Sequence, residues 1–215
     1  MIKVKQFCFN PFAMSTFVVS DSESGDAVAI DPGMINSRER KEFDTYIADN
    51  HLNLQQIVNT HLHLDHCFGD NYVSDKYGVK IAAHPADASL GLKLGEQARR
   101  FGLKLEGDAG KVDIDVPLAD GDTITVGQYK LHVLYVPGHS PGSIALYSPE
   151  GAFVISGDTL FHRSIGRTDL EGGDLRTLQR SIADKLMTLP GSTRVLPGHD
   201  KFTTVDDERR SNPYI

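Results

Sequence analysis

The chain of 215 residues has two cysteines, no tryptophan and no long run of apolar residues. Two cysteines cannot form a disulfide framework, and no run approaches the roughly eighteen apolar residues that a membrane-spanning helix needs. The N-terminal stretch MIKVKQFCFNPF has no uninterrupted apolar segment before Asn10 and Pro11, so it does not have the pattern of a signal peptide. We therefore expect a cytoplasmic protein without a membrane partner.

Clustered positive charge is also scarce. The formal net charge is -7, and Lys and Arg form no dense block. The pair Arg209-Arg210 follows three acidic residues, which is typical of a solvated helix face. A nucleic-acid partner has no electrostatic basis in this sequence, and a small-molecule ligand is the expectation that is left.

Strand-like and helix-like patterns alternate from the N-terminus onward. Short β-prone runs over residues 4–10, 15–21 and 26–33, separated by turn-rich segments, predict an antiparallel meander. Apolar residues at near-helical spacing over residues 35–50 predict a helix with Ser37 as its N-cap.

The alternation continues to the C-terminus. Residues 101–120 are polar and glycine-containing, which is typical of either an active-site lid or an ordinary long loop. Because strands and helices are mixed in both halves, we expect one domain over residues 1–215, an α/β sandwich of two mixed sheets with helices on the outer faces. The further predicted strands cover residues 54–60, 79–84, 123–136, 143–158 and 193–199, with a turn inside 123–136 and 143–158; the further predicted helices cover residues 68–76, 85–100 and 174–187.

Metal-binding side chains are concentrated directly after the strand predicted at residues 54–60. The stretch THLHLDH contains the pattern H-x-H-x-D-H, formed by His61, His63, Asp65 and His66. Residues two apart in an extended or turning segment project to the same side. His61 and His63 can therefore bind one ion, while Asp65 and His66 face a second.

Three further candidates each lie in a glycine-containing turn after a β-prone run. They are His139 in LYVPGHSPGS, Asp158 in VISGDTL and His199 in RVLPGHD. Each is a weak signal by itself, because a His after Pro-Gly is more often a turn residue. Together with the cluster they supply five imidazoles and two carboxylates, a donor set that suits Zn, Fe or Mn rather than Ca or Mg.

The order of these residues resembles that of metallo-β-lactamase-fold hydrolases, and the resemblance covers nearly the whole chain. It implies an αββα sandwich that binds two divalent metal ions, with zinc as the expected metal and iron or manganese as alternatives. The implied ligands are His61, His63 and His139 for the first ion, Asp65, His66 and His199 for the second, and Asp158 as the bridge between both.

Within this family, two segments are similar to glyoxalase II, the hydroxyacylglutathione hydrolase, and above all to its short bacterial relatives. They are GDTLFHRSIGRTDLEGGD and the ending PGHDKFTTVDDERRSNPYI. Full-length glyoxalase II carries a C-terminal helical domain that binds much of the glutathione. Because nothing follows Ile215, we expect the short form without that domain. The resemblance implies a small-molecule thioester substrate.

Hydrolysis by this chain requires a source of nucleophile. The spacing G-x-S-x-G occurs in GHSPG, residues 138–142, but this segment contains the candidate ligand His139, and we do not interpret it as a serine elbow. A bound metal lowers the pKa of water toward neutrality and polarises the carbonyl under attack, so it supplies a hydroxide nucleophile. We expect a metal-dependent thioesterase in which Asp65 is catalytic and orients the water.

Other functions are compatible with the same motifs. Persulfide dioxygenases also resemble this chain in H-x-H-x-D-H and G-R-T-D, and by similarity they bind a single iron at the positions of His61, His139 and Asp158. The segment GDTLF matches the hydrolase form better than the dioxygenase form. A lactone or β-lactam hydrolase and a non-catalytic metal-binding protein are the remaining alternatives.

Several other residues have two interpretations. Arg167 and Asp169 either anchor a substrate carboxylate or form an internal ion pair that fixes the loop behind Asp158, and we favour the ion pair. Cys67 is predicted to be a small buried helix residue rather than a ligand. Candidates for lining a substrate pocket are Phe12, Met14 and His162.

Overall fold

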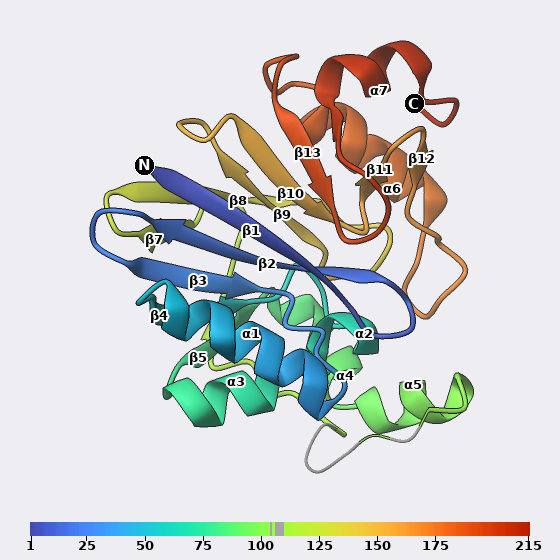
Figure 1. The fold of residues 1–215 in the computed structure, drawn as a ribbon. Coiled ribbons are helices and arrows are strands. Elements are labelled where there is room, and N and C mark those ends of the chain that lie inside the picture. Colours follow the sequence, from blue (N-terminus) through green and yellow to red (C-terminus); the bar gives the residue numbers. More distant parts are fainter. Residues whose placement is uncertain (104, 106–109) are drawn as a thin grey trace.

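Two six-stranded β-sheets pack face to face, with helices against their outer faces, in the computed structural model of the chain (Figure 1). The structure describes residues 1–103, 105 and 110–215. This architecture confirms the predicted sandwich of two mixed sheets.

The first sheet comes from the N-terminal half of the chain. Its first three strands form the predicted antiparallel meander, whereas β3 to β6 run parallel. Parallel neighbours need a crossover connection, and helices supply it between β3 and β4 and between β4 and β5. In spatial order the strands are β1 (Ile2–Phe9), β2 (Met14–Asp21), β3 (Asp26–Ile30), β4 (Asn53–Val58), β5 (Lys80–Ala83) and β6 (Val116–Pro117).

The second sheet comes from the C-terminal half. All its neighbouring strands are antiparallel except β10 and β13, which are parallel. The two predicted hairpins are confirmed as β7–β8 and β9–β10. In spatial order the strands are β14 (Thr203–Thr204), β13 (Arg194–Pro197), β10 (Phe153–Gly157), β9 (Ile144–Ser148), β8 (Tyr129–Tyr135) and β7 (Thr123–Val126); a separate hairpin pairs β11 (Leu160–Phe161) with β12 (Ser164–Ile165).

Three apolar layers hold the sandwich together. Alternation along β2 assigns its side chains to two of them: Phe17 and Val19 pack between the sheets, whereas Val18 packs under the helices of the first sheet. The third layer lies between the second sheet and its helices, where Leu178 and Val195 are fully buried. Both sheets are thus fixed against each other and against their outer cover.

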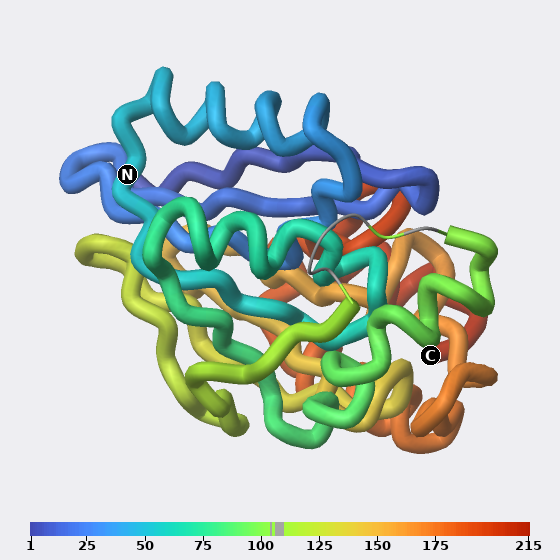
Figure 2. The backbone as a smooth tube through the Cα atoms, turned by 90° about the horizontal axis from the view of Figure 1, so that it is seen from below, coloured from blue at the N-terminus to red at the C-terminus, as the bar shows by residue number. Residues whose placement is uncertain are grey.

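Helices cover the two outer faces. Helices α1 and α3 lie over the first sheet, and α6 and α7 lie on the side of the second (Figures 1 and 2). Among the described residues, no helix is both long and apolar enough to cross a membrane. The helices are α1 (Ser37–Asp49), α2 (Leu64–Cys67), α3 (Asp70–Tyr77), α4 (Ala88–Gly91), α5 (Leu94–Arg100), α6 (Leu175–Ser181) and α7 (Val205–Ser211), with a 3₁₀ turn at Pro85–Asp87 and a π-helical turn at Ile182–Leu186.

Three local predictions need correction. The helix predicted over residues 85–100 is broken into a 3₁₀ turn and two short α-helices. The cluster predicted as extended or turning is so only at its start, because α2 begins at Leu64 and puts Asp65 and His66 on a helical turn. The excursion over residues 101–120 contains the short strand β6, and the lid prediction there includes residues 104 and 106–109, which lie outside the described residues.

The N-cap of α1 is Asn36 and not Ser37. The Asn36 side chain accepts hydrogen bonds from the backbone N–H groups of Arg38 and Glu39, both at 3.0 Å. We expect Asn36→Ala to lower the free energy of unfolding by about 1 kcal/mol, because these N–H groups lose their partner. Urea unfolding measures the difference. The exposed Ser37→Ala is the control, and an equal loss in both variants would contradict the assignment.

The fold brings several strand ends to one edge of the sandwich. Because β8 and β10 are both antiparallel to β9, and β13 is parallel to β10, all three strands end at the same edge of the second sheet. The parallel strands β3 and β4 likewise end together in the first sheet. The loops after β4, β8, β10 and β13 carry the predicted metal-binding residues, so the topology makes one site of distant segments.

Candidate metal centre

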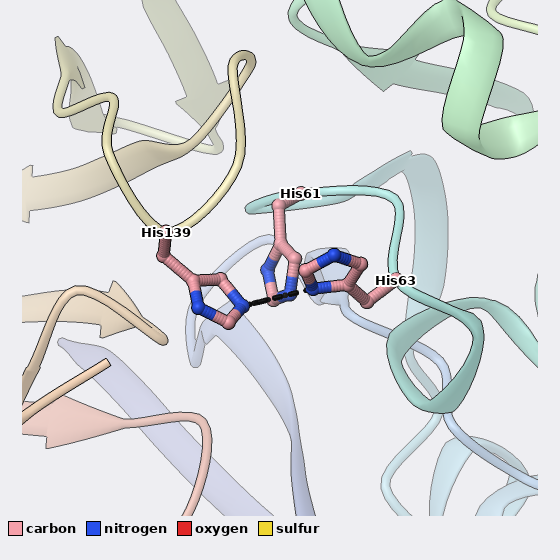
Figure 3. Close-up of side chains that lie close together, drawn as sticks. All are labelled: His61, His63 and His139. Carbon is pink, nitrogen blue, oxygen red and sulfur yellow. Dashed lines mark hydrogen bonds between the residues drawn. The ribbon is translucent and has the colours of Figure 1, made fainter. Parts of the chain in front are cut away.

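Three histidine rings from two loops point toward one another (Figure 3). His61 and His63 lie on the loop between β4 and α2, and His139 lies on the loop between β8 and β9. The His139 Nε2 atom is 2.8 Å from His63 Nδ1 and 3.2 Å from His61 Nε2. All three side chains are buried. This three-histidine group has the spacing and geometry in which one ion can be bound by three nitrogens.

A second group lies beside the first. His199, after β13, places its Nε2 atom 3.1 Å from Asp65 Oδ2. His66 Nε2 is 3.9 Å from the same carboxylate oxygen. One ligand atom from each of Asp65, His66 and His199 falls within 4.8 Å of the other two, so this mixed group can also hold an ion.

Asp158 lies between the two groups. Its Oδ1 is 3.4 Å from His66 Nε2, and its Oδ2 is 3.6 Å from His139 Nε2 and also 3.6 Å from His199 Nε2. One carboxylate therefore faces histidines of both groups. The structure thus brings all seven residues singled out in the sequence into one cluster. Their role as metal ligands stays a prediction.

Most of the histidines are oriented by a second contact on the far side of the ring. His139 Nδ1 donates to the Arg167 carbonyl oxygen at 2.8 Å, and His199 Nδ1 donates to the Phe12 carbonyl oxygen at 3.0 Å. A carbonyl oxygen can only accept, so each Nδ1 carries a proton, and each Nε2 is the ring nitrogen that faces the cluster. His66 Nδ1 lies 2.9 Å from Asp31 Oδ2, and its Nε2 faces Asp158.

The electrostatics of the cluster differ between its two groups. Burial, together with the neighbouring histidines, lowers the pKa of His63 to about 3 and holds the pKa of His61 well below its ordinary value. Burial would also lower the pKa of His66, but the carboxylates of Asp31 and Asp158 override it and raise that pKa. His61 and His63 are therefore neutral at pH 7, the form in which imidazole binds metals.

Neighbouring histidines keep the carboxylates of Asp65 and Asp158 ionised. Burial would raise the pKa of Asp158, yet His66 beside it holds that pKa well below the ordinary range. The pKa of Asp65 is also lowered, because His66 and His199 outweigh its burial. Both carboxylates are thus available as anionic ligands near neutral pH.

Sequence reasoning missed the residues that hold these loops. Asp31 accepts hydrogen bonds from the Thr60 backbone and hydroxyl at 2.7 and 2.6 Å, in addition to its contact with His66. Its position in AIDPG, directly after a β-prone run, is the signal that marked the other strand-end residues. Gln97 accepts from the Leu64 backbone at 3.0 Å and is found only through the tertiary structure. Asn10 donates to the Asp65 carbonyl at 2.9 Å.

A pocket of about 420 Å³ opens onto the cluster. Phe12 lines it, as predicted. Met14 does not, because it is the first residue of β2 and is fully buried, and His162 is absent from the lining described by the structure and lies against Glu208 instead. The walls around the cluster residues are Phe12, Leu64, Gln97, Phe101, Phe161, Ser164, Ile165, Arg167 and Leu170.

The loop after Asp158 contains the predicted ion pair. Arg167 contacts Asp169 through two nitrogen–oxygen hydrogen bonds of 2.7 Å each, which confirms the internal pairing. The same loop supports the cluster through its backbone, at the Arg167 carbonyl that orients His139. Cys67 is buried on α2, as predicted.

A two-sheet sandwich with histidines and aspartates gathered at one edge defines the class of metallohydrolases to which this chain is related. The model of the metallo-beta-lactamase superfamily matches residues 10–199, and the chain belongs to this superfamily. It is 34% identical to the hydroxyacylglutathione hydrolase GloC of Haemophilus influenzae, over 95% of this chain and 93% of the relative. It is 32% identical to the mitochondrial persulfide dioxygenase ETHE1 of Mus musculus, over 93% of this chain and 70% of the relative.

Solved structures show the same fold. The BLEG-1 B3 metallo-beta-lactamase superposes with a TM-score of 0.87 at 31% identity, and the match covers 99% of both chains. TTHA1623 in a di-iron-bound form superposes with a TM-score of 0.86 at 34% identity, over 98% of this chain and 100% of that one. The fold and family are therefore shown, whereas the relatives differ in activity.

Proposed function

We propose that this protein is a metal-dependent thioesterase of the glyoxalase II type, which hydrolyses S-(2-hydroxyacyl)glutathione or a related small-molecule thioester. The observation that carries the proposal is the convergence of nitrogen and oxygen donors from seven residues in one cluster, five of which line a pocket with largely apolar walls. Similarity to a hydroxyacylglutathione hydrolase over nearly the full length of both chains supports it.

Unpartnered atoms in the cluster support the binding of cations. His66 Nε2 and Asp158 Oδ1 are buried and have no hydrogen-bond partner among the described residues. Buried polar atoms are normally paired, so such atoms call for an explanation. A cation between them would satisfy both. We propose two divalent ions, zinc first and iron or manganese as alternatives, bound by His61, His63 and His139, by Asp65, His66 and His199, and by Asp158 between them.

The residues of the chain have distinct tasks in this reaction. The metal ions, when bound, supply a nucleophile from water and polarise the carbonyl. Asp65 is ionised and partly exposed toward the pocket, with Oδ2 held 3.1 Å from His199 Nε2. We assign it the task of accepting a hydrogen bond from the attacking water and so orienting it. Phe12, Phe101 and Leu170 provide apolar contact for the substrate.

A persulfide dioxygenase is the second candidate. The similarity to ETHE1 favours it. The contact of Asp158 with His139 also favours it, because the resemblance to persulfide dioxygenases places these two residues among the three ligands of a single iron. The two candidates differ in their needs, because the dioxygenase consumes O₂ and the thioesterase consumes water. A lactone or β-lactam hydrolase on the same site is a third candidate, with BLEG-1 as its structural relative.

Metal removal tests the proposed function. Chelated protein is expected to lose hydrolysis of S-lactoylglutathione by on the order of 10²-fold or more, because the bound metal is proposed to supply the nucleophile, and zinc should restore it. Metal content is measured by mass spectrometry and turnover by the loss of thioester absorbance. One iron per chain with O₂ uptake on glutathione persulfide would replace the proposal with the dioxygenase. Failure of loaded protein on thioester, lactone, β-lactam and persulfide substrates would exclude catalysis.

A further inference from the structure

One fully buried carboxylate outside the metal-binding cluster touches both loops that carry the three-histidine group. Asp87, at the end of the 3₁₀ turn after β5, has no exposed surface. Its Oδ2 accepts from the Leu62 backbone N–H at 3.1 Å, and Leu62 stands between His61 and His63. The same oxygen accepts from the Ser140 hydroxyl at 2.7 Å, and Ser140 follows His139.

A third bond completes the contact. Asp87 Oδ1 accepts from the Gly142 backbone N–H at 2.5 Å. A Cβ atom at Gly142 would lie 2.6 Å from Asp87 Cγ, so glycine is required for the His139 loop to approach this closely. Both carboxylate oxygens are therefore occupied by donors from two segments that lie 25 and 53 or more positions away in sequence.

The burial of the Asp87 carboxylate has a free-energy cost that is unusual for a residue with only a structural role. A buried carboxylate without a charged partner is costly, and hydrogen bonds compensate for only part of that cost. Burial raises the pKa of Asp87, although the donors of Ser140, Leu62 and Gly142 counteract it. The strand β9 already links the two loops through the Ile144 N–H donating to the Thr60 carbonyl at 2.8 Å. The fold therefore does not depend on Asp87 to join them.

We propose that Asp87 is a positioning residue for metal binding: it fixes the His61–His63 loop relative to the His139 loop and thereby sets the affinity of the three-histidine group for its ion. The inference rests on the metal ligands proposed above but not on the identity of the substrate. It concerns one of the two groups, because the donors to Asp87 flank His61, His63 and His139 and none of them flanks His199.

The variant Asp87→Asn tests this role with little change of shape. Whichever way the amide is turned, its NH₂ group faces a backbone N–H of Leu62 or Gly142, so at least one bond to the loops is lost. Metal-free protein is titrated with Zn²⁺ by calorimetry in a His199→Ala background, in which the mixed group has lost one ligand. The tightest remaining ion then reports on the three-histidine group. We expect Asp87→Asn to weaken its binding by about 10- to 100-fold.

Glu208→Gln is the matched control. Glu208 is also fully buried and accepts three hydrogen bonds, from Arg163, Thr203 and Asn212, but none of these residues belongs to the cluster. We expect it to lower the melting temperature of the metal-free protein without weakening Zn²⁺ binding. The variant Ser140→Ala removes one bond to Asp87 with less risk to folding, and it should weaken Zn²⁺ binding by a smaller factor than Asp87→Asn.

The outcomes separate this inference from the proposed function. Unchanged Zn²⁺ affinity in Asp87→Asn and Ser140→Ala, or an equal loss in Glu208→Gln, would overturn the positioning role. Absence of Zn²⁺ binding in the otherwise unaltered protein would overturn the inference together with the metal site. Tight Zn²⁺ binding that depends on Asp87, in a protein that hydrolyses no thioester, would support the inference while the proposed function fails.

Discussion

Asp158→Ala is expected to reduce thioester hydrolysis by more than about 10³-fold, because it removes the carboxylate that would face both proposed ions and help to generate the nucleophile. The two Asp158 oxygens lie 3.4 to 3.6 Å from histidines of both groups. Loss of Asp158 should therefore lower the metal content as well as the turnover. Metal analysis and an S-lactoylglutathione assay on the same preparation measure both.

The protein should remain folded in this variant. The apolar layer between the two sheets contains no residue of the cluster, so its packing does not depend on Asp158. Circular dichroism is expected to show unchanged secondary structure. Asp184→Ala replaces an exposed aspartate in the π-helical turn and serves as the control. Full metal content and full activity in Asp158→Ala would exclude the bridging assignment.

Gly198→Ala is expected to have the second largest effect. A Cβ atom at Gly198 would lie 2.3 Å from Asp158 Oδ1 and 2.8 Å from His66 Cε1, both closer than nonbonded atoms allow. The added methyl group must displace Asp158 and His66, the proposed ligands on either side of it. We expect Zn²⁺ affinity and thioester turnover to fall by about 10- to 100-fold, as for other changes that misplace metal ligands.

Calorimetric Zn²⁺ titration and steady-state kinetics measure this effect. The control is Gly110→Ala, since a Cβ at Gly110 meets no described atom within 4 Å. Equal affinity in Gly198→Ala and Gly110→Ala would show that the close approach at Gly198 is unimportant for the site. Such a result would also weaken the assignment of Asp158 as a ligand of both ions.

The sequence predicted the elements that carry strong local signals. The β-prone runs and the glycine turns after them are local features. Loops that follow strands ending at the same edge of a sheet lie close together. The seven cluster residues could therefore be identified before their distances were known. The prediction of Ser37 as the N-cap of α1 failed for a local reason, since the N-cap is the adjacent Asn36. Both residue types are favourable N-caps, and a periodic pattern does not distinguish adjacent positions.

Other features depend on tertiary contacts that no local pattern contains. The helical pattern over residues 85–100 predicts one helix, but the chain there forms two short helices instead. At the end of the first, Gly91 packs so closely against the Val112 backbone that an added Cβ would lie 2.7 Å from the Val112 carbonyl oxygen. Met14 was expected at the mouth of the pocket, yet its side chain packs beneath Gly33 and is fully buried. Asp87 receives its hydrogen bonds from distant segments, so its environment cannot be predicted from its neighbours in sequence.

The cluster spans the seam between the two halves of the chain. His61, His63 and His66 follow a strand of the first sheet, whereas His139, Asp158 and His199 follow strands of the second. The two cysteines are free, so no disulfide joins the halves. Ions held at this seam would act as removable cross-links, and by mass action each would stabilise the folded chain by about 2.7 kcal/mol at a hundred times its Kd. Metal supply would then govern how long the protein persists as well as how fast it works.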